Sequence, residues 1–149
     1  MATRSSDAAP RAWGRCLCGA VRYEVRGPLR DVLLCHCIEC RRWCGYVGAF
    51  TAAQKADFVL TEGSALRWVS SPDSDRHAER GFCGECGSSL FWQPRDKDRI
   101  SIAVGTLDRP TELRIAGHWY AHQGGDYDEL PEDGLPRDAE LAGFEIPWR

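Results

Sequence analysis

The sequence Cys83-Gly84-Glu85-Cys86-Gly87 contains two cysteines three positions apart, followed directly by a glycine. In such a segment a tight turn directs both thiols to one side and leaves backbone N–H groups free to bond to the sulfurs. A second pair, in Cys16-Leu17-Cys18-Gly19, has its thiols on one face of an extended chain. Together the two pairs supply four thiolates, the number that fills a closed tetrahedral zinc site.

A third group of cysteines is denser. Cys35-His36-Cys37-Ile38-Glu39-Cys40 places three thiols within one short turn, where they can occupy three corners of a tetrahedron. The spacing leaves the fourth corner unassigned. An open corner is what a catalytic zinc requires, because water, a carbonyl oxygen or an incoming thiol can bind there. His36 or Cys44 could instead fill it.

The two alternative ligands differ in their expected geometry. His36 lies between two cysteines, so in an extended segment its ring points to the opposite face, where it would orient the ligands by hydrogen bonding. Cys44 follows Cys40 by four residues and shares its face if this turn is helical. Cys44 is then a fourth ligand, a redox-active thiol or an idle buried thiol, and we favour the last two.

Composition limits the class of protein. A chain of 149 residues suits one domain, and we expect a disordered arm at residues 1–12 and a single zinc-binding domain over residues 13–149. The net charge of -3 argues against a nucleic-acid partner, which a basic face would bind. The first residues contain no apolar stretch long enough for a signal peptide or membrane span, which predicts a cytoplasmic protein that contacts no membrane. Because cytosolic thiols stay reduced, the eight cysteines indicate metal binding rather than disulfides.

Short segments with strand periodicity recur along the chain, separated by Gly, Pro, Ser and Asp. This pattern predicts an all-β fold. Only Glu39 to Trp43 and Thr51 to Lys55 are expected to form short helical turns, Ser70 to Arg80 is expected to be an exposed loop, and regular patterning fades from His118 onward. The predicted strands are Val21 to Val25, Val32 to Leu34, Tyr46 to Phe50, Phe58 to Thr61, Leu66 to Val69, Leu90 to Trp92 and Ile100 to Val104.

The cysteine groups, with their neighbours and in this order, resemble the family of glutathione-dependent formaldehyde-activating enzymes, whose domain is shared with centromere protein V. The residues that carry the resemblance are Gly14 to Tyr23, Cys35 to Arg41, Arg80 to Leu90, Ile102 to Asp108 and Asp133 to Pro136.

The resemblance implies a β-tent, an all-β zinc-binding fold of short antiparallel strands, with two zinc ions per chain. It implies that formaldehyde and glutathione condense to S-(hydroxymethyl)glutathione, the reaction of a carbon–sulfur lyase. The implied partners are therefore small molecules. The resemblance is compatible with a chain that forms an oligomer. The implied structural zinc ligands are Cys16, Cys18, Cys83 and Cys86, and the implied catalytic zinc ligands are Cys35, Cys37 and Cys40.

Two further residues are candidates for contact with the substrate. Arg41 follows the dense cysteine group, where its charge could attract a glutathione carboxylate or lower the pKa of a thiol. His118 and His122 are four residues apart, but the surrounding glycines disfavour a helix, and we expect loop residues with His118 near the pocket. The competing functions are a non-catalytic zinc-stabilised binding module, a glutathione or aldehyde carrier, and a thiol redox or metal-buffering protein.

Overall fold

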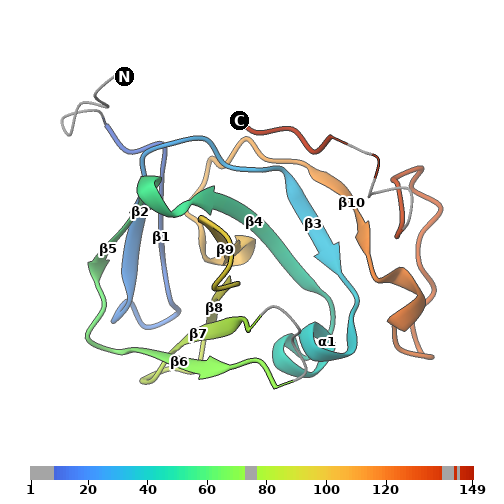
Figure 1. Ribbon diagram of the computed structural model, residues 1–149, viewed down its shortest axis with the longest axis horizontal. Helices are drawn as coiled ribbons and strands as arrows, with labels where there is room; N and C mark the ends of the chain where they lie inside the picture. The colour runs from blue at the N-terminus through green and yellow to red at the C-terminus, as the bar shows by residue number, and fades with distance from the viewer. Residues whose placement is uncertain (1–8, 73–76, 139–142, 144) are drawn as a thin grey trace.

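The computed structural model describes residues 9–72, 77–138, 143 and 145–149 (Figure 1). It is mostly β-sheet, which confirms the predicted all-β class. A short helix, α1 (Ile38–Cys44), and three single 3-10 turns, η1 (Lys55–Asp57), η2 (Val104–Thr106) and η3 (Ala121–Gln123), accompany the strands. The strands are β1 (Ala12–Arg15), β2 (Arg22–Val25), β3 (Val32–Cys35), β4 (Gly48–Gln54), β5 (Phe58–Glu62), β6 (Leu66–Ser70), β7 (Glu79–Cys83), β8 (Ser89–Gln93), β9 (Arg99–Ala103) and β10 (Ile115–Trp119).

The strands form two sheets. The small sheet has the order β1-β2-β5, and the large one has the order β10-β3-β4-β9-β8-β7-β6. The expected antiparallel pairing holds for every strand pair except β10 and β3, which are parallel. That parallel pair places the end of β10 beside Cys35, since Trp119 pairs with Cys35.

The predicted strands all correspond to observed ones, whereas some predicted turns and loops do not. The turn of helix expected at Thr51 to Lys55 is wrong, because Thr51 to Gln54 continue β4. Thr51, Ala52 and Ala53 are all fully buried, so this strand lacks the alternation of a half-exposed one. The helical turn expected at Glu39 to Trp43 is confirmed as part of α1.

Strands β1, β7 and β10 have no counterpart in the sequence prediction. The expected loop at Ser70 to Arg80 is shorter than predicted, because β6 ends at Ser70 and β7 begins at Glu79; residues 73–76 lie outside the described residues. Of the arm expected at residues 1–12, residues 1–8 also lie outside them, and Ala12 already begins β1. His118 lies in β10 rather than in a loop.

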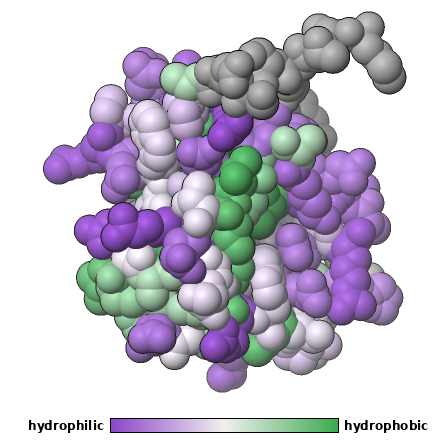
Figure 2. Space-filling view, turned by 90° about the vertical axis from the view of Figure 1, so that its left-hand side faces the viewer, coloured by the Kyte–Doolittle hydropathy of each residue, from purple (hydrophilic) through white to green (hydrophobic). Residues whose placement is uncertain are grey.

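The core lies between the two sheets and centres on three aromatic rings. Tyr23 of β2 stacks on Phe58, and Phe91 of β8 meets both rings edge to face. Gly14 of β1 is needed here, because a Cβ at this position would lie 2.3 Å from the Tyr23 ring. Figure 2 shows the side of the molecule that carries the small sheet, where hydrophilic side chains surround a narrow apolar band. One face of this sheet is therefore buried and the other meets solvent.

The segment at the carboxyl end crosses the start of β3. The backbones of Leu29 and Arg149 exchange hydrogen bonds of 2.8 and 2.7 Å, and the Arg149 Nε atom donates to both oxygens of Asp31, at 2.9 and 3.0 Å. Asp31 is 2% exposed and also accepts from the Arg114 backbone N–H at 3.0 Å. The Asp31 carboxylate is thus fully engaged and anchors this segment.

We expect Asp31→Asn to reduce the free energy of unfolding by about 1–2 kcal/mol at pH 7, because it weakens charge-assisted hydrogen bonds to a buried acceptor. Burial alone would raise the pKa of Asp31, but the hydrogen bonds from Arg149 and the Arg114 amide lower it below its ordinary value of 3.8. The stabilisation is therefore present above about pH 4 and is lost as the pH falls further.

Urea unfolding of both proteins between pH 3 and pH 8 measures the difference. Glu112→Gln is the control, because this carboxylate is 76% exposed and lies 4.0 Å from its partner Arg11. Equal stability of the wild type and Asp31→Asn at pH 7 would contradict the prediction.

Candidate metal centres and active-site pocket

The turn after β1 and the turn between β7 and β8 bring four cysteines together in what we call the closed cluster: Cys16, Cys18, Cys83 and Cys86. All four sulfur atoms lie within 4.8 Å of one another. The Cys16 and Cys18 sulfurs are 3.6 Å apart, and those of Cys18 and Cys83 are 3.8 Å apart. Sulfurs bound to one zinc ion at about 2.3 Å are about 3.8 Å apart in a tetrahedron, so these residues fit a metal of that size.

Local backbone conformation directs these thiols inward. Gly19 and Gly87, which follow the two cysteine pairs, have φ angles of 82° and 78°. This left-handed region is readily open only to glycine, which explains why each pair ends in that residue. The Val21 backbone N–H donates to the Cys16 sulfur at 3.3 Å, a bond that favours a thiolate.

Three cysteines form a second group, the open cluster: Cys35 at the end of β3, Cys37 at the N-cap of α1, and Cys40 inside α1. Their sulfurs also lie within 4.8 Å of one another. The Cys37 sulfur accepts from the Cys40 backbone N–H at 3.3 Å, so the helix start itself fixes two of the three. Among the described residues neither His36 nor Cys44 joins this group, which leaves three protein ligands.

The three thiols of the open cluster strongly influence one another's protonation. Hydrogen bonds from Cys35 and Cys40 lower the pKa of Cys37 to about 2, whereas hydrogen bonding to Cys37 and then to Cys40 raises the pKa of Cys35 far above its ordinary value. Without a cation, one thiolate is therefore stabilised by thiols that stay protonated. A divalent metal offsets the repulsion among three thiolates, so the donor set fits such an ion.

Arg80 joins the open cluster to a second chain of polar groups. Its Nη1 and Nη2 atoms each lie 3.9 Å from the Cys40 sulfur, and Nη2 also donates to Glu39 at 3.0 Å. The Nε atom donates to the Ser71 hydroxyl at 3.1 Å, and that hydroxyl donates to Glu39 at 2.5 Å. Arg80 is only 4% exposed. Sequence reasoning gave it no role, because nothing in the local sequence connects a β7 residue to α1.

We expect Arg80→Gln to slow alkylation of Cys40 by roughly tenfold once a chelator has emptied the open cluster, because the Arg80 charge opposes the effects that raise the pKa of Cys40 to about 12. The rate of iodoacetamide modification at about pH 8.5, where the thiolate fraction of Cys40 follows its pKa, measures this by peptide mass spectrometry. Arg42→Gln is the matched control, since Arg42 is an exposed arginine of α1, the helix that carries Cys40. Equal rates in the wild type and Arg80→Gln would contradict the assigned role, provided circular dichroism shows the variant folded.

His36 points away from the open cluster, as expected from its position. Its Nε2 atom lies 2.9 Å from His118 Nδ1, and His118 Nε2 lies 2.8 Å from the Asp133 carboxylate. Because the carboxylate accepts from His118 Nε2–H, His118 Nδ1 must accept from His36 Nε2–H. Both rings are buried, so this chain of hydrogen bonds holds the loop between β3 and α1 against β10.

The remaining candidates lie outside the pocket. His122 is in η3, exposed and 3.5 Å from Asp138, and forms no metal pair with His118. Arg41 is in α1 but does not line the pocket. Burial raises the pKa of the half-buried Cys44 thiol, which therefore stays protonated and weakly nucleophilic near neutral pH.

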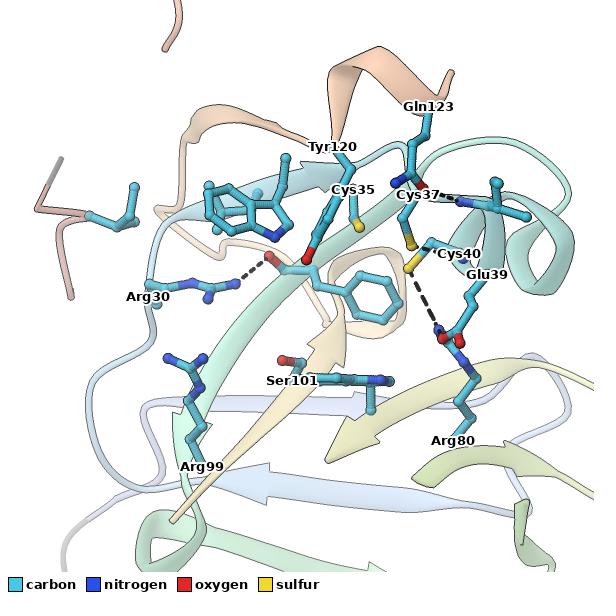
Figure 3. Close-up of a pocket in the computed structure, with 16 residues that line it drawn as sticks. Arg30, Cys35, Cys37, Glu39, Cys40, Arg80, Arg99, Ser101, Tyr120 and Gln123 are labelled. Atoms are coloured by element: carbon cyan, nitrogen blue, oxygen red, sulfur yellow. Dashed lines mark hydrogen bonds and ion pairs between the residues drawn. The ribbon is translucent and has the colours of Figure 1, made fainter. Parts of the chain in front are cut away.

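The open cluster faces a cavity of about 600 Å³ (Figure 3). All three of its cysteines line the wall, together with charged and aromatic side chains from the large sheet and from the segment after β10. A cavity of this size holds a ligand as large as a small peptide. The other lining residues are Arg30, Leu33, Ile38, Glu39, Phe50, Arg80, Trp92, Arg99, Ser101, Trp119, Tyr120, Gln123 and Ile146.

A family model described as glutathione-dependent formaldehyde-activating enzyme matches residues 11–123. The chain belongs to this family. The match begins one residue before β1 and includes both clusters, as the resemblance of the cysteine motifs predicts. Within the described residues of this family member, no helix combines the length and the apolar character needed to cross a membrane.

Relatives with curated names point to the same family. An uncharacterized lyase of Schizosaccharomyces pombe is 33% identical over 84 residues, which are 56% of this chain and 58% of that protein. A Halomonas elongata protein, named provisionally as a glutathione-dependent formaldehyde-activating enzyme, is 30% identical over 66% of this chain and 69% of its own length. The chain thus spans between about half and two thirds of the length of these relatives.

Among solved structures, a Rhodobacter sphaeroides protein has a similar fold. The two chains have a TM-score of 0.54 and 26% sequence identity, over 69% of this chain and 98% of the other.

Proposed function

We propose that this member of the family is a carbon–sulfur lyase-type enzyme that condenses formaldehyde, or a related aldehyde, with glutathione or another small thiol. The observation that carries the proposal is a three-cysteine cluster whose remaining side opens into a cavity large enough for both reactants. Family membership and a relative named as a lyase support the reaction class.

Both clusters are proposed to hold zinc, one ion each. Four sulfurs complete a tetrahedron in the closed cluster, which is proposed to be structural. Three sulfurs leave one position free in the open cluster, which is proposed to be the reactive centre. Zinc bound there would supply a Lewis acid that holds a thiol as its thiolate or polarises an aldehyde oxygen.

In the reaction the thiol sulfur forms a bond to the carbonyl carbon, and the π electrons of the C=O bond move to oxygen. The thiol loses one proton and the new hydroxyl gains one, so the step is balanced without another reactant. The cavity walls hold the two reactants together, which replaces a bimolecular encounter. Arg80 lies beside Cys40 and contributes positive potential where the substrate sulfur carries negative charge.

Eight cysteines without a disulfide among them suit a reducing compartment, and we propose a cytoplasmic location. The proposed partners are small molecules rather than nucleic acid or membranes, because the net charge of -3 provides no excess of basic residues.

Formation of S-(hydroxymethyl)glutathione by zinc-loaded protein tests the function. Exchange spectroscopy by NMR gives the rate above that of the uncatalysed condensation. We expect acceleration that is proportional to protein concentration and that is lost when a chelator empties the open cluster. A rate equal to the spontaneous one, with glutathione still bound, would contradict catalysis and favour a carrier.

A further inference from the structure

Two arginines lie side by side in the cavity wall, away from the open cluster. Arg30 lies just before β3, and Arg99 is the first residue of β9. In Figure 3 the Arg99 side chain points toward Arg30, and the three cysteines lie on the other side of the cavity. Ser101 lines the same wall, because residues two apart in a strand share one face.

Neither arginine has an acidic partner among the described residues. Arg30 donates only to backbone oxygens, from Nη2 to Phe50 at 3.2 Å and from Nε to Asp31 at 3.3 Å. The carboxylate of Asp31 is not available to it, because Arg149 and the Arg114 amide occupy that group. The Nε atom of Arg99 is buried and has no hydrogen-bond partner within the part of the chain that is described.

This arrangement is electrostatically unfavourable in the absence of an anion. Burial, and then the neighbouring charge of Arg99, lower the pKa of Arg30 to about 10. Two like charges that share a partly desolvated wall repel each other, and a buried guanidinium N–H without an acceptor adds a desolvation cost. A bound anion would offset both effects. Arg80 is different, since Glu39, Ser71 and Cys40 already occupy its donors.

We propose that Arg30 and Arg99 form a carboxylate-binding subsite that selects, as the thiol substrate, a molecule carrying a carboxylate at a distance from its sulfur. The guanidinium fork matches the two oxygens of a carboxylate, which a thiol lacking that group would leave unused. With its carboxylate on the two arginines, such a substrate extends across the cavity and its sulfur reaches the open cluster. Glutathione, which has two carboxylates, belongs to this class. The proposal rests on the proposed function for the identity of the substrate as a thiol.

Equilibrium binding of S-methylglutathione and of its diethyl ester tests the subsite without any reaction. The methyl group blocks the sulfur, so binding depends on the rest of the ligand. Fluorescence of Trp92 and Trp119, which line the cavity, reports the titration, and isothermal calorimetry provides a second measurement.

For the wild type we expect the free acid to bind about tenfold or more tightly than the ester. Arg30→Gln and Arg99→Gln should each reduce affinity for the free acid to near that of the ester and leave ester binding unchanged. Arg99→Lys keeps the positive charge but not the forked guanidinium group. Its affinity for the free acid should lie between those of the wild type and Arg99→Gln. Arg95→Gln is the matched control, because this side chain is 64% exposed, pairs with Glu79 and does not line the cavity. It should bind both ligands like the wild type.

Equal affinity of the wild type for acid and ester would overturn the proposal, and this comparison requires no variant to fold. Unchanged binding of the free acid to folded Arg30→Gln and Arg99→Gln would overturn it as well, as would the lack of any binding of the free acid. The proposed function fails separately. If the arginines discriminate the acid from the ester but the condensation is not accelerated, the subsite is supported and the proposed activity is rejected. If the condensation is accelerated without such discrimination, only the subsite is rejected.

Discussion

Cys83→Ser is expected to lower the melting temperature by about 15 °C and to remove the metal from the closed cluster. Cys83 is fully buried and belongs to the cluster that joins the turn after β1 to the turn between β7 and β8. Loss of a structural metal is among the largest single-residue effects, about 5 kcal/mol, and each kcal/mol shifts the melting temperature of a chain this size by about 3 °C.

Thermal unfolding by circular dichroism, with zinc content measured on the same samples, checks this expectation. Cys44→Ser is the matched control, because Cys44 is a half-buried cysteine outside both clusters. It should retain the zinc content of the wild type and melt within a few degrees of it. A Cys83→Ser protein with unchanged zinc content and melting temperature would show that the closed cluster does not hold the fold together.

Cys40→Ser is expected to lose activity and to retain the fold, in contrast to Cys83→Ser, which is expected to lose stability. A serine hydroxyl is a poor zinc ligand, so the open cluster loses one of its three sulfurs and with it the metal. We expect zinc content to fall from two ions per chain to one and the condensation to return to the spontaneous rate. The melting temperature should change far less than in Cys83→Ser, because the cluster lies at a cavity wall within consecutive elements of the chain.

Metal analysis, thermal unfolding and the NMR rate measurement on one preparation test these three outcomes together. Loss of the fold in Cys40→Ser would make the second metal structural and would contradict the proposed division of roles. Retention of two zinc ions and of the accelerated rate would place the reactive centre elsewhere.

Local pattern predicted the elements in which side chains alternate or cysteines cluster. β2 was predicted because apolar Tyr23 and Val25 alternate with polar residues in the sequence, and the structure buries both of them while Arg22 meets solvent. β7 was missed because its charged Arg80 resembles a loop residue, whereas its partners Glu39 and Cys40 come from a distant helix. Periodicity also could not identify β4 beyond Phe50, since its buried residues follow one another without alternation.

The sequence by itself determined the cysteine groups, because ligands two, three or five positions apart meet through local backbone geometry. It also indicated that the two distant pairs converge, since a closed zinc site requires four thiolates. Only the tertiary structure decided what surrounds the open cluster. The pairing of β10 with β3 places His118 against His36, and the large sheet carries Arg80 to Cys40 and Arg99 toward Arg30. Such contacts depend on strand order and register. The sequence around a single charged or aromatic residue does not predict either of these.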